Sequence, residues 1–162
     1  MLAGSMASSF HGEPRSTQDI DLVIDPDEQA LLRFAEGLDR ERFYVGDPRA
    51  ALVSQSQFNI IDTRTGWKGD LIIRKNRPFS REEFARREQV EILGVTTHIA
   101  SPEDTILAKL EWAQAGGSDR QLRDVVAILA VTSRALDDDY LDRWAGELGV
   151  ADDLAAARAL AA

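Results

Sequence analysis

The chain has 162 residues, of which 44% are hydrophobic and 29% charged, a composition typical of a soluble globular protein that can bury one core. Its net charge of −9 excludes a broad basic surface for nucleic acid, and the absence of cysteine excludes a disulfide scaffold and a cysteine zinc site. No apolar run approaches the roughly 20 residues of a membrane helix, and the first residues lack the regions of a signal peptide. We therefore predict a cytoplasmic protein with no membrane partner.

The first hundred residues are predicted to mix strands with helices. Residues 1–3 are expected to end a strand, Gly4-Ser5 to open a short helix, and Asp19–Asp25 to form an apolar strand. Further strands are expected at 43–45, 58–63, 67–74, 89–93 and 96–99, with Arg64–Gly66 as a hairpin loop. Further helices are expected to begin at Pro26-Asp27, Pro48 and Ser80.

The last sixty residues are predicted to be helical. Ser101 is a good N-cap because Pro102 and two acids follow it, and this helix should run to about Ala115. Further helices are expected after Ser118 and at 138–148 and 152–160. The fold class is therefore α+β: residues 1–100 form a mixed sheet flanked by helices, and residues 101–162 form a helical bundle packed on it.

Two acids within one strand are the sharpest chemical feature of the sequence. Asp19 and Asp21 interrupt an apolar strand, although aspartate is depleted in strands. Side chains two residues apart lie on the same face, so the two carboxylates are expected to lie side by side and to repel each other. Magnesium prefers such oxygen ligands and is often held by carboxylates together with substrate phosphates. The pair therefore indicates a metal site, whereas a loop cap or a surface hairpin is the alternative.

Two other features support the metal interpretation. Gly4-Ser5 stands at the start of a helix, where backbone N–H groups and a hydroxyl can bind phosphate oxygens. Asp70 is a third acid within an apolar strand, again against strand preference. A pair of metal ions held by three such carboxylates can align a hydroxyl and a leaving pyrophosphate.

This constellation resembles the nucleotidyltransferase superfamily, whose pattern is a Gly-Ser turn, a short helix, Asp-x-Asp on a strand and a later carboxylate. The run from Gly4 to Asp25 is similar to the uncharacterised bacterial branch close to the AbiEii toxin-like group. The resemblance implies Mg²⁺ or Mn²⁺ as cofactor, a nucleoside triphosphate (NTP) as substrate, and transfer of its nucleoside monophosphate to a hydroxyl with loss of pyrophosphate.

The resemblance also implies roles for single residues. Asp19 and Asp21 ligate metal, Asp70 ligates the second metal and takes the proton from the hydroxyl, and Gly4 and Ser5 hold the triphosphate. Lys109 and Asp124 match the later lysine and aspartate of the nucleotide site. The family has a helix and a full strand before Gly-Ser, where this chain has residues 1–3. We therefore expect an unpaired neighbouring strand, and with it a homodimer.

Several residues allow two interpretations. Arg15 and Thr17 precede the acidic strand, where a phosphate would lie, but Arg15 can instead pair with Glu13 and Thr17 can cap the loop. Lys109 can be a solvated helix lysine, and Asp124 can pair within its own helix with Arg120 or Arg123. The basic residues from Lys68 to Arg87 are the one candidate patch for RNA, with a solvated hairpin and helix face as the alternative.

We therefore carry two main hypotheses. The first is a metal-dependent nucleotidyltransferase acting on RNA or protein, and the overall acidity favours a protein or small-molecule acceptor or a local RNA site. The second is a non-catalytic nucleotidyltransferase-like binding module, in a toxin–antitoxin pair for example. Phosphoester hydrolysis needs a similar acid cluster but usually adds histidine ligands, and His11 and His98 each stand alone.

Overall fold

The structure is a computed structural model that describes residues 1–116, 118–132 and 136–162. The described residues form eight helices and six strands, so the α+β class expected from the sequence is confirmed. They divide into two compact units, one of residues 1–5 and 16–99 and one of residues 6–15 and 100–162. Helix α1 (Gly4–His11) begins in the first unit and continues into the second.

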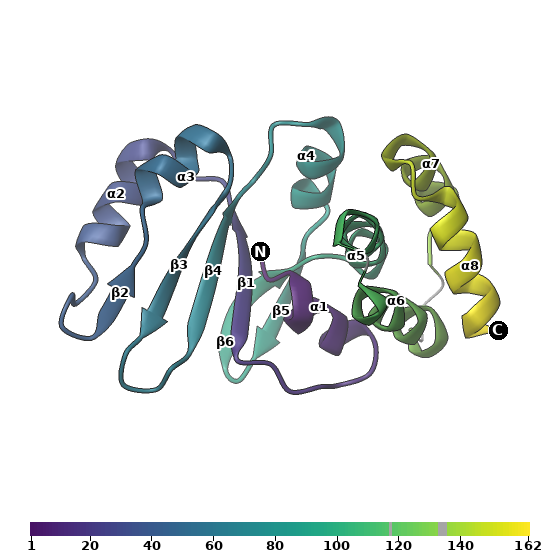
Figure 1. Ribbon diagram of the computed structural model, residues 1–162, viewed down its shortest axis with the longest axis horizontal. Coiled ribbons are helices and arrows are strands. Elements are labelled where there is room, and N and C mark those ends of the chain that lie inside the picture. The colour runs from purple at the N-terminus through teal and green to yellow at the C-terminus, as the bar shows by residue number, and fades with distance from the viewer. Residues whose placement is uncertain (117, 133–135) are drawn as a thin grey trace. The chain divides into compact units, whose positions relative to one another are not determined.

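The first unit contains a mixed four-stranded sheet in the order β1-β4-β3-β2 (Figure 1). Strand β1 runs parallel to β4, whereas β3 is antiparallel to both β4 and β2. Strands β5 and β6 form a separate antiparallel hairpin. The elements follow in the order β1 (Asp19–Ile24), α2 (Glu28–Glu36), β2 (Phe43–Val45), α3 (Pro48–Ser54), β3 (Gln57–Asp62), β4 (Lys68–Ile73), α4 (Pro78–Ala85), β5 (Glu88–Ile92) and β6 (Val95–Ile99).

Helices α2 and α3 supply the core on one face of this sheet. Leu31 of α2 and Ala51 of α3 belong to one buried cluster with Phe58, Leu71 and Ile73 of the strands. Both helices begin at an aspartate that caps the first turn: Asp27 accepts a hydrogen bond from the N–H of Ala30 at 2.7 Å, and Asp47 accepts one from Ala50 at 2.9 Å. With one face packed in this way, polar side chains of β1 and β4 are confined to the other.

The start of α4 differs from the sequence prediction. The helix begins at Pro78, and Ser80 lies inside its first turn, where its hydroxyl accepts a hydrogen bond from Arg77 at 2.9 Å. Proline is favoured at the first helical position because its missing N–H would have no helical partner there. This preference places the start two residues before the predicted capping box.

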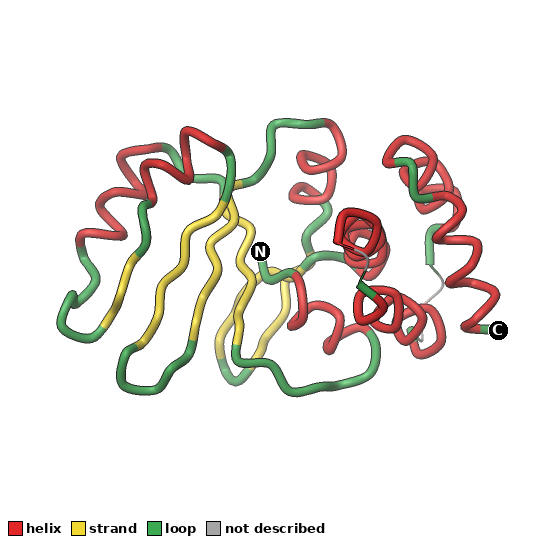
Figure 2. Tube along the Cα trace, viewed as in Figure 1, coloured by secondary structure: helices red, strands yellow, loops and turns green. Residues whose placement is uncertain are grey.

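The second unit is helical, as Figure 2 shows. Its C-terminal helices are α5 (Pro102–Gly116), α6 (Asp119–Val131), α7 (Asp138–Leu148) and α8 (Ala151–Ala161). Helix α5 packs against α6 and α7, and α8 packs against α6 and α7. Ser101 caps α5 as predicted, because its hydroxyl accepts a hydrogen bond from the N–H of Asp104 at 3.1 Å. No helix in the described ranges is long and apolar enough to cross a membrane.

The segment 6–15 groups with residues 100–162 and not with the strands that follow it in the sequence. Within this unit the ring of His11 forms a 2.7 Å hydrogen bond with the carbonyl of Ala100, and the hydroxyl of Thr132 donates to the carbonyl of His11 at 3.3 Å. The second half of α1 and the loop after it therefore bring Ser8 and Arg15 into the helical unit.

Candidate functional site

Three carboxylates and one lysine lie on the sheet face opposite the α2–α3 core. In the parallel pairing of β1 with β4, Asp19 lies opposite Lys68 and Asp21 lies opposite Asp70. Side chains two residues apart on a strand share a face, and so do direct partners on neighbouring strands. The four side chains therefore lie next to one another on one face of the sheet, and we call this group the acidic face. Asn59 of β3 is the partner of Asp70 on the other side and extends the same face.

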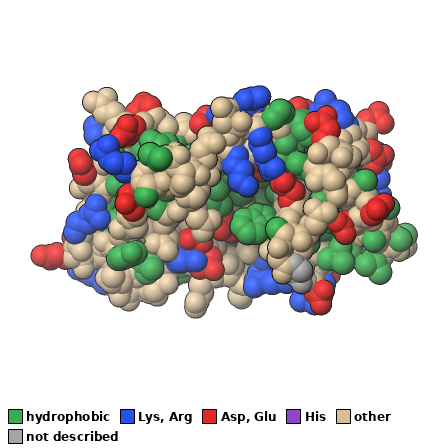
Figure 3. Space-filling view, turned by 45° about the horizontal axis from the view of Figure 1, so that its top comes forward, with side chains coloured by type: hydrophobic (Ala, Val, Ile, Leu, Met, Phe, Trp, Pro, Cys, Tyr) green, Lys and Arg blue, Asp and Glu red, His purple; other side chains and the backbone are tan. Residues whose placement is uncertain are grey.

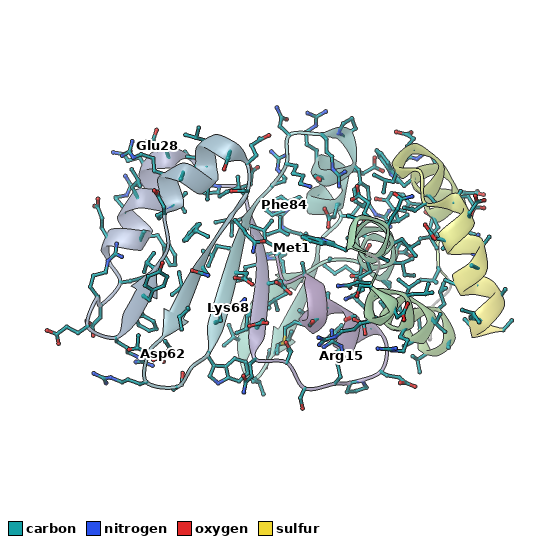
Figure 4. All side chains as sticks on the ribbon, in the orientation of Figure 1. Met1, Arg15, Glu28, Asp62, Lys68 and Phe84 are labelled. Atoms are coloured by element: carbon teal, nitrogen blue, oxygen red, sulfur yellow. The ribbon has the colours of Figure 1, made fainter. Side chains whose placement is uncertain are left out.

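Lys68 is the cation of the acidic face, and Figure 4 labels it on β4. Its Nζ lies 2.9 Å from Oδ2 of Asp70 and 3.5 Å from Oδ1 of Asp19. The side chain of Asp70 is 11% exposed, whereas those of Lys68 and Asp19 are 33% and 54% exposed. The hydrogen bond to Asp70 raises the pKa of Lys68 despite the opposing effect of burial, so this lysine is charged at neutral pH.

The first residues of α1 lie in direct contact with the side chain of Asp21. Gly4 has φ +54°, a left-handed conformation that favours glycine, and a Cβ at this residue would lie 1.9 Å from Oδ2 of Asp21. The N–H of Ser5 donates to the same oxygen at 3.4 Å. Glycine at residue 4 therefore lets the Asp21 carboxylate approach the helix N-terminus. The predicted contact of Gly4 and Ser5 with a triphosphate remains a prediction.

Residues 1–3 are sufficient to pair with β1, which corrects the expectation of an unpaired edge. The terminal ammonium of Met1 donates to the carbonyl of Val23 at 2.9 Å, and the N–H of Ala3 donates to the carbonyl of Asp21 at 2.9 Å. Leu2 forms an antiparallel bridge to Leu22 and a parallel bridge to Ile99 of β6. The edge from Asp21 to Val23 is therefore paired within the chain, and the homodimer prediction loses its physical reason.

A second polar cluster lies in the helical unit and centres on Asp124 of α6. Its carboxylate accepts hydrogen bonds from Nε and Nη2 of Arg15 at 3.2 and 3.0 Å, from Nζ of Lys109 at 2.7 Å and from the hydroxyl of Ser8 at 3.2 Å. Lys109 also donates to Gln121 at 2.8 Å. The side chains of Asp124 and Lys109 are 11% and 5% exposed. We call these residues the Asp124 cluster.

The contacts of the Asp124 cluster distinguish between the alternative interpretations of Lys109 and Asp124. Lys109 is buried, so it is not a solvated helix lysine. Asp124 pairs with Arg15 and Lys109, which come from other segments of the chain, instead of with Arg120 or Arg123 of its own helix. Burial alone would raise the pKa of Asp124, but the hydrogen bonds from Arg15 and Lys109 outweigh it and lower the pKa.

Thr17 has a local role in the structure. Its hydroxyl oxygen accepts a hydrogen bond from the N–H of Asp19 at 3.2 Å, and the hydroxyl donates back to the carbonyl of Asp19 at 3.1 Å. These two bonds close the loop that enters β1, which matches the capping alternative for this residue. A contact between Thr17 and a phosphate remains a prediction.

The predicted basic patch between Lys68 and Arg87 is partly neutralised. Lys68 pairs with Asp70 and Asp19, and Arg74 pairs with Asp25 at 2.9 Å. In the view of Figure 3, basic and acidic side chains are interspersed over the surface. These pairs weaken the interpretation of this segment as an RNA-binding surface and favour the solvated alternative.

The acidic face fits a divalent cation in the kind of ligand that it offers. Carboxylate oxygens are the ligands that Mg²⁺ and Mn²⁺ prefer, and an ammonium already joins two of the carboxylates. As the side chains stand, no three acidic or histidine residues in the described ranges are arranged to hold one metal ion. Magnesium usually needs only one or two carboxylates, because water and substrate phosphates supply the remaining ligands.

Comparison with known proteins supports the fold. No protein-family model and no curated protein matches the sequence. The structure is similar to the crystal structure of an antigenic nucleotidyltransferase-like protein from Paracoccidioides brasiliensis, with a TM-score of 0.57. The match covers 98% of this chain and 83% of that chain at 19% sequence identity. The chain therefore has a nucleotidyltransferase-like fold with C-terminal helices, and this level of identity supports the fold alone.

Sequence reasoning did not identify Lys68 and Asn59 as parts of the acidic face. Lys68 stands two residues before Asp70, so the period of a strand already places both on one face. What was missing was the register, because only the pairing of β1 with β4 brings Lys68 opposite Asp19. Asn59 carries no comparable signal, since it is a single polar residue in a short strand.

Proposed function

We propose that this protein is a metal-dependent nucleotidyltransferase that moves a nucleoside monophosphate from an NTP to a hydroxyl on RNA or protein. The observation that carries the proposal is the register of Asp21 opposite Asp70, on the face that also bears Asp19 and beside the start of α1. The nucleotidyltransferase-like fold supports it. The sequence from Gly4 to Asp25 supports the more specific likeness to the AbiEii toxin-like branch.

In this proposal Asp19, Asp21 and Asp70 would share a pair of Mg²⁺ or Mn²⁺ ions, with water and substrate phosphates supplying the remaining ligands. The metal would neutralise the charge that develops on the α-phosphate and on the leaving group. The acceptor oxygen forms a bond to the α-phosphorus, the bond from that phosphorus to the β-phosphate oxygen breaks, and pyrophosphate leaves. Asp70 accepts the hydroxyl proton. It is buried, whereas Asp21 is half-buried and Asp19 is exposed, which suits a base shielded from bulk water.

The Asp124 cluster belongs to the proposal through the resemblance. We propose that Lys109 contacts the triphosphate. The carboxylate of Asp124 positions the ammonium of Lys109 and also holds Arg15. An ammonium that is fixed by Asp124 and Gln121 is preorganised, so little side-chain freedom would be lost when phosphate binds.

One observation favours the non-catalytic alternative. Lys68 places a cation of the protein itself among the carboxylates. This cation offsets the repulsion between the carboxylates without metal, as a binding module that never takes up metal would need. In that alternative the three acids and Lys68 form a structural ion-pair network, and the protein binds a partner, such as the other half of a toxin–antitoxin pair, without turnover.

The experiment that separates the two combines the protein with Mg²⁺ or Mn²⁺ and each α-³²P-labelled NTP. Cellular RNA and total protein serve as acceptors, and Asp21→Asn is the control variant. The transferase proposal predicts label in an acceptor or in the protein itself, dependent on metal and lost in Asp21→Asn. No transfer with any of the four NTPs, in preparations shown by circular dichroism to be folded, would favour the binding module.

A further inference from the structure

We propose that Lys68 is an internal counter-ion of the acidic face, whose ammonium stands in for a divalent cation in the metal-free protein and is displaced when metal binds. The inference rests on the proposed function, because it takes the acidic face to be a metal site. It adds a residue that competes with the metal and so sets the metal concentration at which the site fills.

The position of Lys68 is that of a bridge between the two strands. It is the register partner of Asp19 on β1 and lies two residues before Asp70 on β4. Its Nζ is 2.9 Å from Asp70 and 3.5 Å from Asp19, so one ammonium joins carboxylates of both strands. Joining carboxylates of β1 and β4 is also what the proposed metal would do.

The ammonium and a divalent cation cannot both occupy this place. Two cations a few ångströms apart repel strongly in a partly buried site, where screening by water is weaker than in bulk. Metal at Oδ2 of Asp70 would also take the oxygen that Lys68 now contacts. The metal therefore has to displace the ammonium.

Lys68 is the member of the pair that can move. Its side chain is 33% exposed and has a flexible four-carbon stem, whereas that of Asp70 is 11% exposed. We expect the ammonium to swing into solvent while Asp70 stays in place. In the metal-free state the same ammonium offsets the repulsion among Asp19, Asp21 and Asp70.

The first test uses the unmodified protein. The chain has three lysines, Lys68, Lys75 and Lys109, so acetylation by a water-soluble succinimidyl ester followed by peptide mass spectrometry reports on each one. Lys75 is exposed and serves as an internal control. We expect Mn²⁺ to raise the labelling rate of Lys68 by about fivefold relative to EDTA, a factor that corresponds to about 1 kcal/mol and to the upper range for a partly exposed ion pair.

The second test compares variants by calorimetric titration with Mn²⁺ alone. Lys68→Met keeps the length of the stem and removes the charge, so its Kd should fall about tenfold below that of the parent, or about 1.4 kcal/mol. Lys68→Arg keeps the charge and should stay near the parent. Arg74→Met is the matched control, because it breaks the 2.9 Å pair with Asp25, just beyond the ends of the same two strands, without changing the charge of the acidic face.

The outcomes distinguish this inference from the proposed function. Tighter binding by Lys68→Met together with faster labelling of Lys68 in Mn²⁺ supports the inference. If Lys68→Met binds metal and the parent does not, the ammonium is not displaced, so the inference is overturned and the metal site stands. If the parent binds Mn²⁺ and neither the labelling of Lys68 nor the affinity of Lys68→Met changes, the inference is overturned and the metal site stands. If neither parent nor Lys68→Met binds metal, both are overturned.

Discussion

Oδ2 of Asp21 lies 1.9 Å from the position that a Cβ atom at residue 4 would occupy, so only glycine fits there. Asp21 follows Gly4 by 17 residues in the sequence and restricts residue 4 to glycine. Gly4 leaves room for the carboxylate, and the N–H of Ser5 donates a hydrogen bond to the same oxygen at 3.4 Å. The glycine of the Gly-Ser turn therefore serves the acidic face directly, whatever role it has toward phosphate.

Gly4→Ala should destabilise the protein by about 2 kcal/mol or more, because the new Cβ adds a clash with Asp21 to the cost of a left-handed φ. Gly66→Ala is the control: Gly66 also has a positive φ, +77°, but has nothing within 4 Å of its Cβ position. The control should lose about 1 kcal/mol in chemical denaturation. Equal losses in the two variants would show that Asp21 moves aside at no cost.

Asp21→Asn tests whether Asp21 is a ligand or a structural acid. If the acidic face is a metal site, the metal-free variant should be as stable as the parent or slightly more so, because repulsion among the three acids falls. Stabilisation by Mg²⁺ with an NTP, about 2.7 kcal/mol at 100 times Kd, should be absent in thermal melting.

The control for this substitution is Asp25→Asn, which weakens the ion pair with Arg74 beyond the end of the same strand. It should lose up to about 1 kcal/mol and keep the full response to metal and NTP. A destabilised Asp21→Asn that still responds fully to metal would contradict the proposed role of Asp21.

Much of the fold was predictable because it follows from local patterns. The apolar run at β1, the hairpin around Gly66 and the Ser101 cap each depend on neighbouring residues alone. The register of β1 on β4 depends on a partner about 50 residues away, so the place of Lys68 was not predictable. The same holds for Asp124, whose partners Arg15 and Lys109 come from two other segments.

Stability below about pH 4 should depend on Asp124. Its pKa is lowered in the folded protein, so the carboxylate contributes stability above its ordinary pKa of 3.8, and this contribution is lost as the pH falls through the lower folded value. Acid unfolding followed by circular dichroism should show this loss in the parent. Asp124→Asn should lose about 3 kcal/mol at neutral pH, because Lys109 stays buried without its carboxylate, and should depend less on pH in the acid range. An unchanged acid profile in the variant would contradict this account.

Lys109→Met tests the proposed nucleotide contact of the helical unit. Asp124 keeps Arg15 and Ser8 as partners in this variant, so the cluster should hold. We expect the affinity for an NTP with Mg²⁺ to fall at least about tenfold, and the affinity for Mn²⁺ alone to stay the same. Calorimetry with each ligand measures both. Unchanged NTP affinity would limit Lys109 to a structural role.

The central claim, that the acidic face holds divalent metal together with an NTP, is tested most directly by crystallography with Mn²⁺ and a non-hydrolysable NTP analogue. Anomalous scattering identifies the metal independently of the protein atoms. The account predicts a manganese peak bound to carboxylate oxygens of Asp21 and Asp70, with the Lys68 ammonium withdrawn from Asp70. A crystal with the analogue bound elsewhere, no manganese on this face and Lys68 still bridging Asp19 and Asp70 would contradict it.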